Sequence, residues 1–164
     1  MIARPWLPVA RLLESAARVA RRTIPAARDP RDPAELCCVA ARLLCVDLYG
    51  ADRVDRAPLA DWHLWSTARP WSPVEAAIAA GVAEGPIDER ATPGPGVWLV
   101  QVWRGAGPTG GGSGHTLVWI GGADGDGWQL DGVEGRAYDL RVRSWTEVVA
   151  DGRWGVRAAR LLAP

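Results

Sequence analysis

The hydrophobic pattern of this 164-residue chain changes its period once, near Gly96. Before that glycine, apolar residues recur every three or four positions, which is typical of helices that pack along one side. After it, apolar residues alternate with others, which is typical of strands. Helices followed by strands favour one α+β domain, in which an antiparallel sheet carries the helices on one side. The length of the chain fits a single domain of this kind.

Two helices of some length are expected in the first half of the chain. The segment 9–22 is amphipathic and carries arginines in its last turn, where they interact favourably with the helix dipole. A second helix should begin at Asp32-Pro33, an N-cap followed by a proline, and end at Gly50. The pattern also predicts a short helix over 74–83, strands over 97–103, 115–120, 128–131 and 154–162, and a helical turn over 144–149.

These elements divide the single domain, residues 1–164, into three parts. Residues 1–31 hold the N-terminal amphipathic helix and a breaker segment rich in proline. Residues 32–96 form the helical part, which includes an irregular stretch over 51–72, and residues 97–164 form the sheet part.

Composition excludes several classes of function. Nineteen arginines balance nineteen acidic residues, so nothing favours nucleic acid as a partner. The chain contains no lysine, which rules out a P-loop lysine and a Schiff base, and the glycine-rich segment 105–114 is therefore expected to be a flexible loop. No stretch approaches 18 apolar residues, so no transmembrane segment is expected. Pro5, Pro8 and Glu14 interrupt the first apolar run, which argues against a signal peptide and for a cytoplasmic protein.

The three cysteines are odd in number and lie on one predicted helix, at positions 37, 38 and 45. This spacing does not suggest a disulfide framework, and it suits a reducing compartment. Two adjacent thiols with distant histidines also make a poor zinc site, so no metal or other cofactor is expected. We interpret Cys45 as a small buried residue of the core.

One pair of segments does point to chemistry. Cys37 and Cys38 lie in the first turns of their helix, near unpaired N–H groups that favour a thiolate. His115 begins a strand directly after the glycine-rich loop and shares a strand face with Leu117 and Trp119. The other histidine, His63, lies between two tryptophans and is interpreted as structural.

An imidazole that serves a nucleophile is usually oriented by a third group. Asp131, at the end of the next strand, is the first candidate for that role. Gln129 lies on the same strand face, and Glu134 follows a few residues later, so both are held in reserve. Cys38 is the reserve nucleophile.

The sequence CCVAARLLCVDLYG resembles the nucleophile helix of papain-like bacterial cysteine peptidases, in particular those that cleave double-glycine leaders from bacteriocin precursors. The match places Cys37 at the nucleophile, with Ala40 and Ala41 on two alanines of the motif and Tyr49-Gly50 at its end. Gly114-His115 followed by apolar residues, and then Leu130-Asp131, resemble the rest of that site. NlpC-type cell-wall endopeptidases share the same order of a cysteine helix and a Gly-His strand. The resemblance implies a papain-like fold with Cys37, His115 and Asp131 as its catalytic residues.

The chain departs from the family around the nucleophile. Cys38 and Val39 replace a glycine and a proline, and the glutamine that usually donates to the oxyanion is missing upstream. Two hypotheses follow. The first is a cysteine hydrolase that cleaves an amide bond in a peptide, a protein or peptidoglycan, as a peptidase, amidase or deamidase. The second is a catalytically inactive papain-like domain that binds a protein partner through exposed tryptophans and the N-terminal helix.

Overall fold

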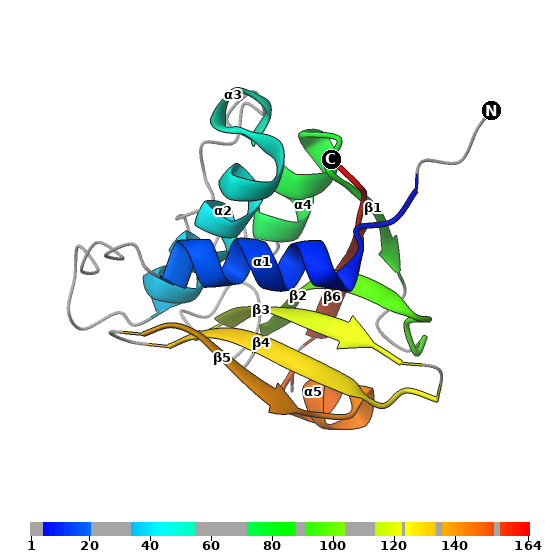
Figure 1. Ribbon diagram of the computed structural model, residues 1–164. Helices are drawn as coiled ribbons and strands as arrows, with labels where there is room; N and C mark the ends of the chain where they lie inside the picture. The colour runs from blue at the N-terminus through cyan, green and yellow to red at the C-terminus, as the bar shows by residue number, and fades with distance from the viewer. Residues whose placement is uncertain are drawn as a thin grey trace.

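A six-stranded antiparallel sheet organises the protein, with strand order β1-β6-β2-β3-β4-β5 (Figure 1). The computed structural model describes residues 5–20, 34–54, 72–87, 91–103, 114–122, 124–133, 136–152 and 155–164. The helices within them are α1 (Val9–Ala20), α2 (Ala34–Tyr49), α3 (Ala51–Val54), α4 (Ser72–Ala79) and α5 (Trp145–Asp151). The strands are β1 (Ala83–Ile87), β2 (Gly96–Trp103), β3 (Gly114–Gly121), β4 (Gly127–Val133), β5 (Arg136–Val142) and β6 (Gly155–Leu161).

The α+β class predicted from the sequence is confirmed. Strands β2 to β5 follow one another as antiparallel neighbours, and β6 returns to pair with β2 on its other side. The predicted helix over 9–22 corresponds to α1, and the predicted end of the second helix at Gly50 is correct, since that glycine has a φ of 87°. A left-handed backbone suits glycine at a helix end because it has no Cβ to clash.

Three local predictions were wrong. The helix predicted over 74–83 ends at Ala79, and Ala83 begins β1 instead. Strand β5 was not predicted, although Tyr138, Leu140 and Val142 alternate with Asp139 and Arg141 in its sequence. The segment 51–72, expected to be irregular, begins with the single turn of α3; residues 55–71 lie outside the described part of the chain.

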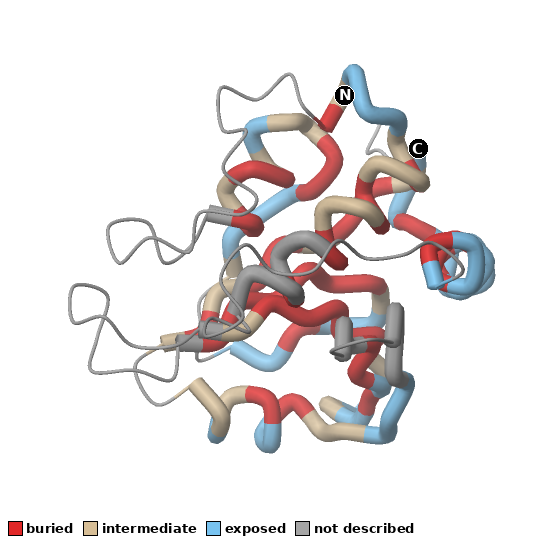
Figure 2. The backbone as a smooth tube through the Cα atoms, turned by 90° about the vertical axis from the view of Figure 1, so that its left-hand side faces the viewer, coloured by how far each residue is buried: buried red, intermediate tan, exposed pale blue. Residues whose placement is uncertain are grey.

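Helices cover both faces of the sheet, although all of them were expected on one side. Helices α1, α2 and α4 pack on the first face, where the larger hydrophobic core lies. Helix α5 packs on the opposite face, because Trp145 and Val148 form a second core with Trp119 and its neighbours. Figure 2 shows buried residues, in red, along the central strands and along parts of the helices. We refer to these two sides as the α2 face and the α5 face.

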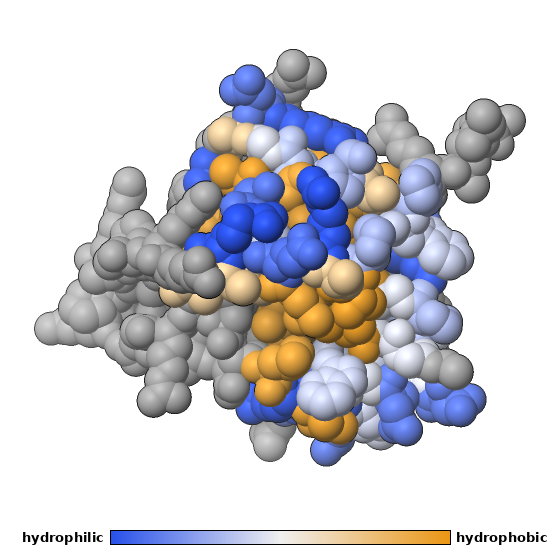
Figure 3. All heavy atoms as spheres, viewed as in Figure 1, coloured by the Kyte–Doolittle hydropathy of each residue, from blue (hydrophilic) through white to orange (hydrophobic). Residues whose placement is uncertain are grey.

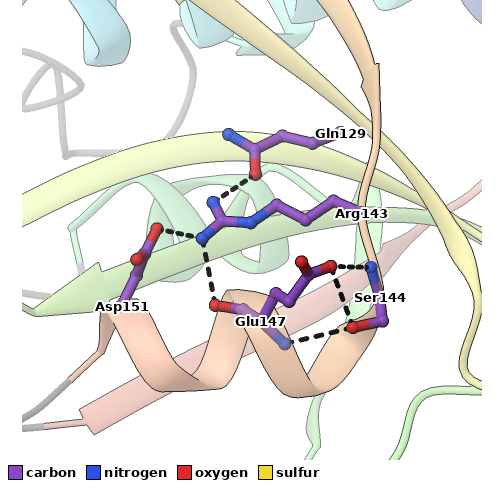
Figure 4. A network of polar contacts seen from close by, with 5 residues as sticks. All are labelled: Gln129, Arg143, Ser144, Glu147 and Asp151. Carbon is purple, nitrogen blue, oxygen red and sulfur yellow. Dashed lines mark hydrogen bonds and ion pairs between the residues drawn. The ribbon is translucent and has the colours of Figure 1, made fainter.

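A polar network holds α5 in place (Figure 4). Ser144 is its N-cap and forms a capping box with Glu147. Arg143 donates to Gln129 Oε1 on β4 at 2.7 Å and to the carbonyl of Glu147 at 3.0 Å, and it forms an ion pair with Asp151. One guanidinium therefore ties both turns of α5 to the buried side of β4.

A second network joins α1 to α2. The Ser15 hydroxyl donates to Asp47 Oδ2 at 2.7 Å, and Arg18 donates to the same oxygen from Nε at 3.0 Å and from Nη2 at 2.8 Å. The Ser15 side chain is buried, and the side chain of Asp47 is only 7% exposed. The network sets the position of α1 across α2, which in turn carries the candidate nucleophile.

Replacing Asp47 by alanine is expected to destabilise the fold by about 1–3 kcal/mol, because the buried Ser15 hydroxyl loses its acceptor. Urea unfolding would measure this change. The matched control is Glu14→Ala, a change on the exposed side of α1 that should stay within about 0.5 kcal/mol of wild type. Equal stabilities for the two variants would show that the network does not hold α1 on α2.

Candidate functional site

Cys37 is the fourth residue of α2, at the end of its first turn, and contacts the start of β3. Its side chain is 4% exposed, and its sulfur accepts a hydrogen bond from the backbone N–H of Thr116 at 3.4 Å. Since the peptide C–N and Cα–C bonds are about 1.3 and 1.5 Å long, the Cα of His115 lies within about 6 Å of that sulfur. The cysteine helix and the start of β3, far apart in the sequence, are thus in contact.

Small side chains bring α2 this close to the sheet. One face of the helix is fully buried and consists of Cys37, Ala40, Ala41, Leu44 and Leu48. The two alanines lie on the turns next to Cys37, where α2 packs on β3 and β4. Their short side chains let the helix backbone approach the strands, so the thiol can meet a main-chain N–H of β3.

His115 is the second residue of β3 and is half-buried. It pairs with Val102 on β2, and its neighbours two and four positions on, Leu117 and Trp119, belong to the core on the α5 face. Val118 and Ile120 belong to the core on the α2 face. By this alternation the register position of His115 is on the α5 face, whereas Cys37 contacts β3 from the α2 face. An imidazole–thiol pair therefore has to form around the end of β3 that begins at Gly114.

The other predicted site residues are placed in different ways. Asp131 is in β4, two positions after Gln129, so by alternation its position lies on the same face of the sheet as that of His115. The side chain of Asp131 lies outside the described part. Gln129 is buried, and its side-chain oxygen accepts from Arg143, which gives it a structural role in the network around α5. The side chain of Cys38, and all of Glu134 and His63, lie outside the described residues.

Cys45 is fully buried among apolar side chains, as the sequence predicted. Burial raises its pKa to about 12, so this thiol stays protonated at any ordinary pH. Neither Cys45 nor Cys37 forms a disulfide. Cys45 lies inside the core on the α2 face, whereas Cys37 lies at its edge.

The pKa of Cys45 makes the fold sensitive to alkali. The folded protein holds this proton up to about pH 12, whereas the unfolded chain releases it above about pH 9, so the associated stability is complete below pH 9 and lost as the pH rises. Between pH 8 and about pH 10.5 the free energy of unfolding should fall by about 1–2 kcal/mol more in wild type than in Cys45→Ala. Urea unfolding at the two pH values measures this; equal losses would contradict the assignment.

The sequence did not reveal a row of polar residues beside Cys37. Arg157 on β6, Gln101 on β2 and Thr116 on β3 are cross-strand neighbours with the parity of the α2 face. The next row on that face is apolar and consists of Ala159, Leu99 and Val118. We call Arg157, Gln101 and Thr116 the polar row. Gln101 and Thr116 are polar residues buried inside the protein. The row lies at the end of the sheet where α2 and α4 begin.

An apolar surface lies away from this site, over α1, β4 and β5. Trp128, Leu140 and Val142 have the parity of Leu130, which belongs to the core on the α2 face, yet all three are exposed. Val9 and Leu13 of α1, which packs against β5, are exposed beside them. Figure 3 shows this hydrophobic area, in orange, directly below the polar side of α1. We call these five residues the α1–β5 surface.

The described residues contain no group of three or more His, Cys, Asp or Glu side chains that could hold a metal ion. None of the helices in the described segments has the length and hydropathy needed to cross a bilayer. Comparison of the chain with protein-family models, with curated proteins and with solved structures found no match.

Proposed function

We propose that this protein is a papain-like cysteine hydrolase that cleaves an amide bond in a peptide, a protein or peptidoglycan. The observation that carries the proposal is the 3.4 Å contact between the Cys37 sulfur and the N–H of Thr116, the residue after His115. The order of elements supports it as well: a cysteine helix precedes the sheet, a histidine begins β3, and an aspartate is in the neighbouring strand β4.

In the proposed reaction the Cys37 sulfur attacks the carbonyl carbon of the amide, and its proton passes to His115. The imidazolium then donates that proton to the leaving nitrogen as the C–N bond breaks, which leaves a thioester on Cys37. Water attacks the thioester with His115 as the base, the C–S bond breaks, and the acid is released. Asp131 orients the imidazole, and backbone N–H groups at the start of α2 stabilise the oxyanion.

The same chemistry serves a peptidase, an amidase or a deamidase, and no cofactor is required. Neither Cys37 nor Cys45 forms a disulfide, which suits a reducing compartment, so we propose the cytoplasm as the place of action.

Trapping of the acyl-enzyme tests this proposal directly. The chain has no lysine, so an activated ester such as p-nitrophenyl acetate meets few competing nucleophiles. After an acid quench, peptide mapping should find one acetyl group on Cys37, and Cys37→Ala should remove it. Acetylation confined to the N-terminus and tyrosines, with the same pattern in Cys37→Ala, would refute the hydrolase.

A second candidate, a partner-binding domain without catalysis, is favoured by the α1–β5 surface, because Val142 is 70% exposed there. Two variants, tested for the protein's function in its own cell, separate the two candidates. Cys37→Ala should inactivate a hydrolase and leave a binding domain active. Val142→Asp, on β5, should inactivate a binding domain and leave a hydrolase active.

A further inference from the structure

We propose that Gln101 is a positioning residue for the Cys37 thiol, an inference that rests on the proposed function. Gln101 is fully buried in the middle of β2 and interrupts the apolar run Val97–Trp103. A buried carboxamide there costs free energy unless it is hydrogen-bonded. Its contacts show what it holds in place.

Gln101 holds the first turn of α4. Its Oε1 accepts a hydrogen bond from the backbone N–H of Val74 at 3.2 Å, so the side chain satisfies one of the donors that a helix start leaves unpaired. Its cross-strand neighbour Arg157 forms an ion pair with Glu75, the next residue of α4. Two adjacent members of the polar row therefore attach α4 to the end of the sheet.

On its other side, Gln101 pairs with Thr116, the residue whose N–H meets the Cys37 sulfur. Side chains of directly opposed residues have Cβ atoms about 4.5–5.5 Å apart. The carboxamide thus lies between the start of α4 and the strand segment that holds the thiol. It aligns α4, β2 and β3 so that the Thr116 N–H remains aimed at Cys37.

A charge at position 101 tests this placement. Gln101→Glu keeps an acceptor for Val74 and has nearly the same shape, while the Nε of Arg157, buried and without a hydrogen-bond partner in the described structure, favours the ionised form. Gln101 lies directly opposite Thr116, whose N–H contacts the Cys37 sulfur, so a negative charge at position 101 should disfavour the thiolate. Among the described residues, the elements next to this site carry His115 on β3, Glu75 on α4 and Arg157 on β6, and Asp131 occupies a position on β4.

The rate of Cys37 alkylation by iodoacetamide is measured against pH in a Cys38→Ala background, with mass spectrometry to identify the site. Gln101→Glu should slow the reaction at pH 6.5 by about threefold to tenfold and move its pH profile upward. The matched control is Gln129→Glu, the other fully buried glutamine, whose side-chain oxygen bonds Arg143 on the α5 face. Its profile should stay at the wild-type pH. Equal profiles for the two variants would overturn the proposal.

If Gln101→Glu does not fold, the neutral Gln101→Met replaces it, with Gln129→Met as its control. Loss of the acceptor for Val74 should change the limiting alkylation rate at high pH at least threefold, whereas the control keeps the wild-type rate. An unchanged limiting rate would overturn the positioning role. These alkylation rates do not depend on turnover, so they test the role of Gln101 independently of the acyl-enzyme experiment. If Cys37 is acetylated but the Gln101 variants react like wild type, the hydrolase stands and only the positioning role of Gln101 is rejected.

Discussion

Alkylation of Cys37 at pH 6 is expected to slow about 100-fold when His115 is replaced by alanine. An ordinary cysteine has a pKa near 8.5, so only about 0.3% of it is thiolate at pH 6, whereas an imidazolium partner keeps most of the thiol ionised. The Cα of His115 is within about 6 Å of the Cys37 sulfur, so the imidazole is close enough to have this effect. Rates are measured with iodoacetamide in a Cys38→Ala background, and Cys45 stays unlabelled because it lies inside the core and burial raises its pKa to about 12.

The chain provides its own control, since His63 is the only other histidine. His63→Ala should leave the alkylation rate of Cys37 within about twofold of wild type, as expected for a change that leaves the thiolate fraction unaltered. The same two variants should differ in the acetyl transfer described above by a factor of about 10²–10⁴, the usual contribution of a general base. Equal rates for His115→Ala and wild type would leave Cys37 without an imidazole partner and favour the binding domain.

Replacing Trp119 by alanine is expected to cost about 3–5 kcal/mol of stability. The side chain is fully buried on the α5 face, its ring lies 5.2 Å from that of Trp145, and its N–H donates to the Arg143 carbonyl at 3.2 Å. The neighbouring backbone is built around the ring: a Cβ on Gly127 would lie 2.5 Å from it. Alanine leaves a cavity that these contacts cannot close, and α5 loses its main anchor.

The matched control is Trp128→Ala, which removes the same side chain from an adjacent strand, where it is 47% exposed. That change should cost no more than about 1 kcal/mol in urea unfolding. Similar losses for the two tryptophans would contradict the second core between the sheet and α5. A large loss for Trp119→Ala with a native-like helical circular dichroism signal would confirm that α5 docks through this ring.

The regular elements of this protein could be predicted where local pattern and packing agree. The helix over 9–20 has one apolar face, and strands β2 and β3 are short runs rich in β-branched and aromatic residues with a glycine at the start. Strand β1, Ala83–Ile87, could not be predicted, since its Gly-Pro pair is unfavourable in a strand and only pairing with β6 makes it one. The face on which α5 packs could not be predicted either, because no local sequence signal indicates which side of a sheet a helix of seven residues will cover.

The candidate site, too, could be predicted from the sequence only in part. Motif spacing and the family resemblance pointed to Cys37 and the start of β3, and the structure brings those two segments into contact. The polar row needed register: Gln101 is visible in the sequence as one polar residue in an apolar strand, but its neighbours Arg157 and Thr116 come from strands paired across long separations. The strand register also shows that Cys37 and the position of His115 lie on opposite faces of the sheet, which spacing in the sequence could not show.

The distance between the Cys37 sulfur and the nearer imidazole nitrogen of His115 tests the central proposal most directly. An experimental structure at neutral pH should place those two atoms within about 4 Å, with the ring turned around the end of β3 toward α2. A ring packed beside Leu117 on the α5 face, with the Cys37 sulfur bonded only to the Thr116 N–H, would contradict the thiolate–imidazole pair and with it the hydrolase.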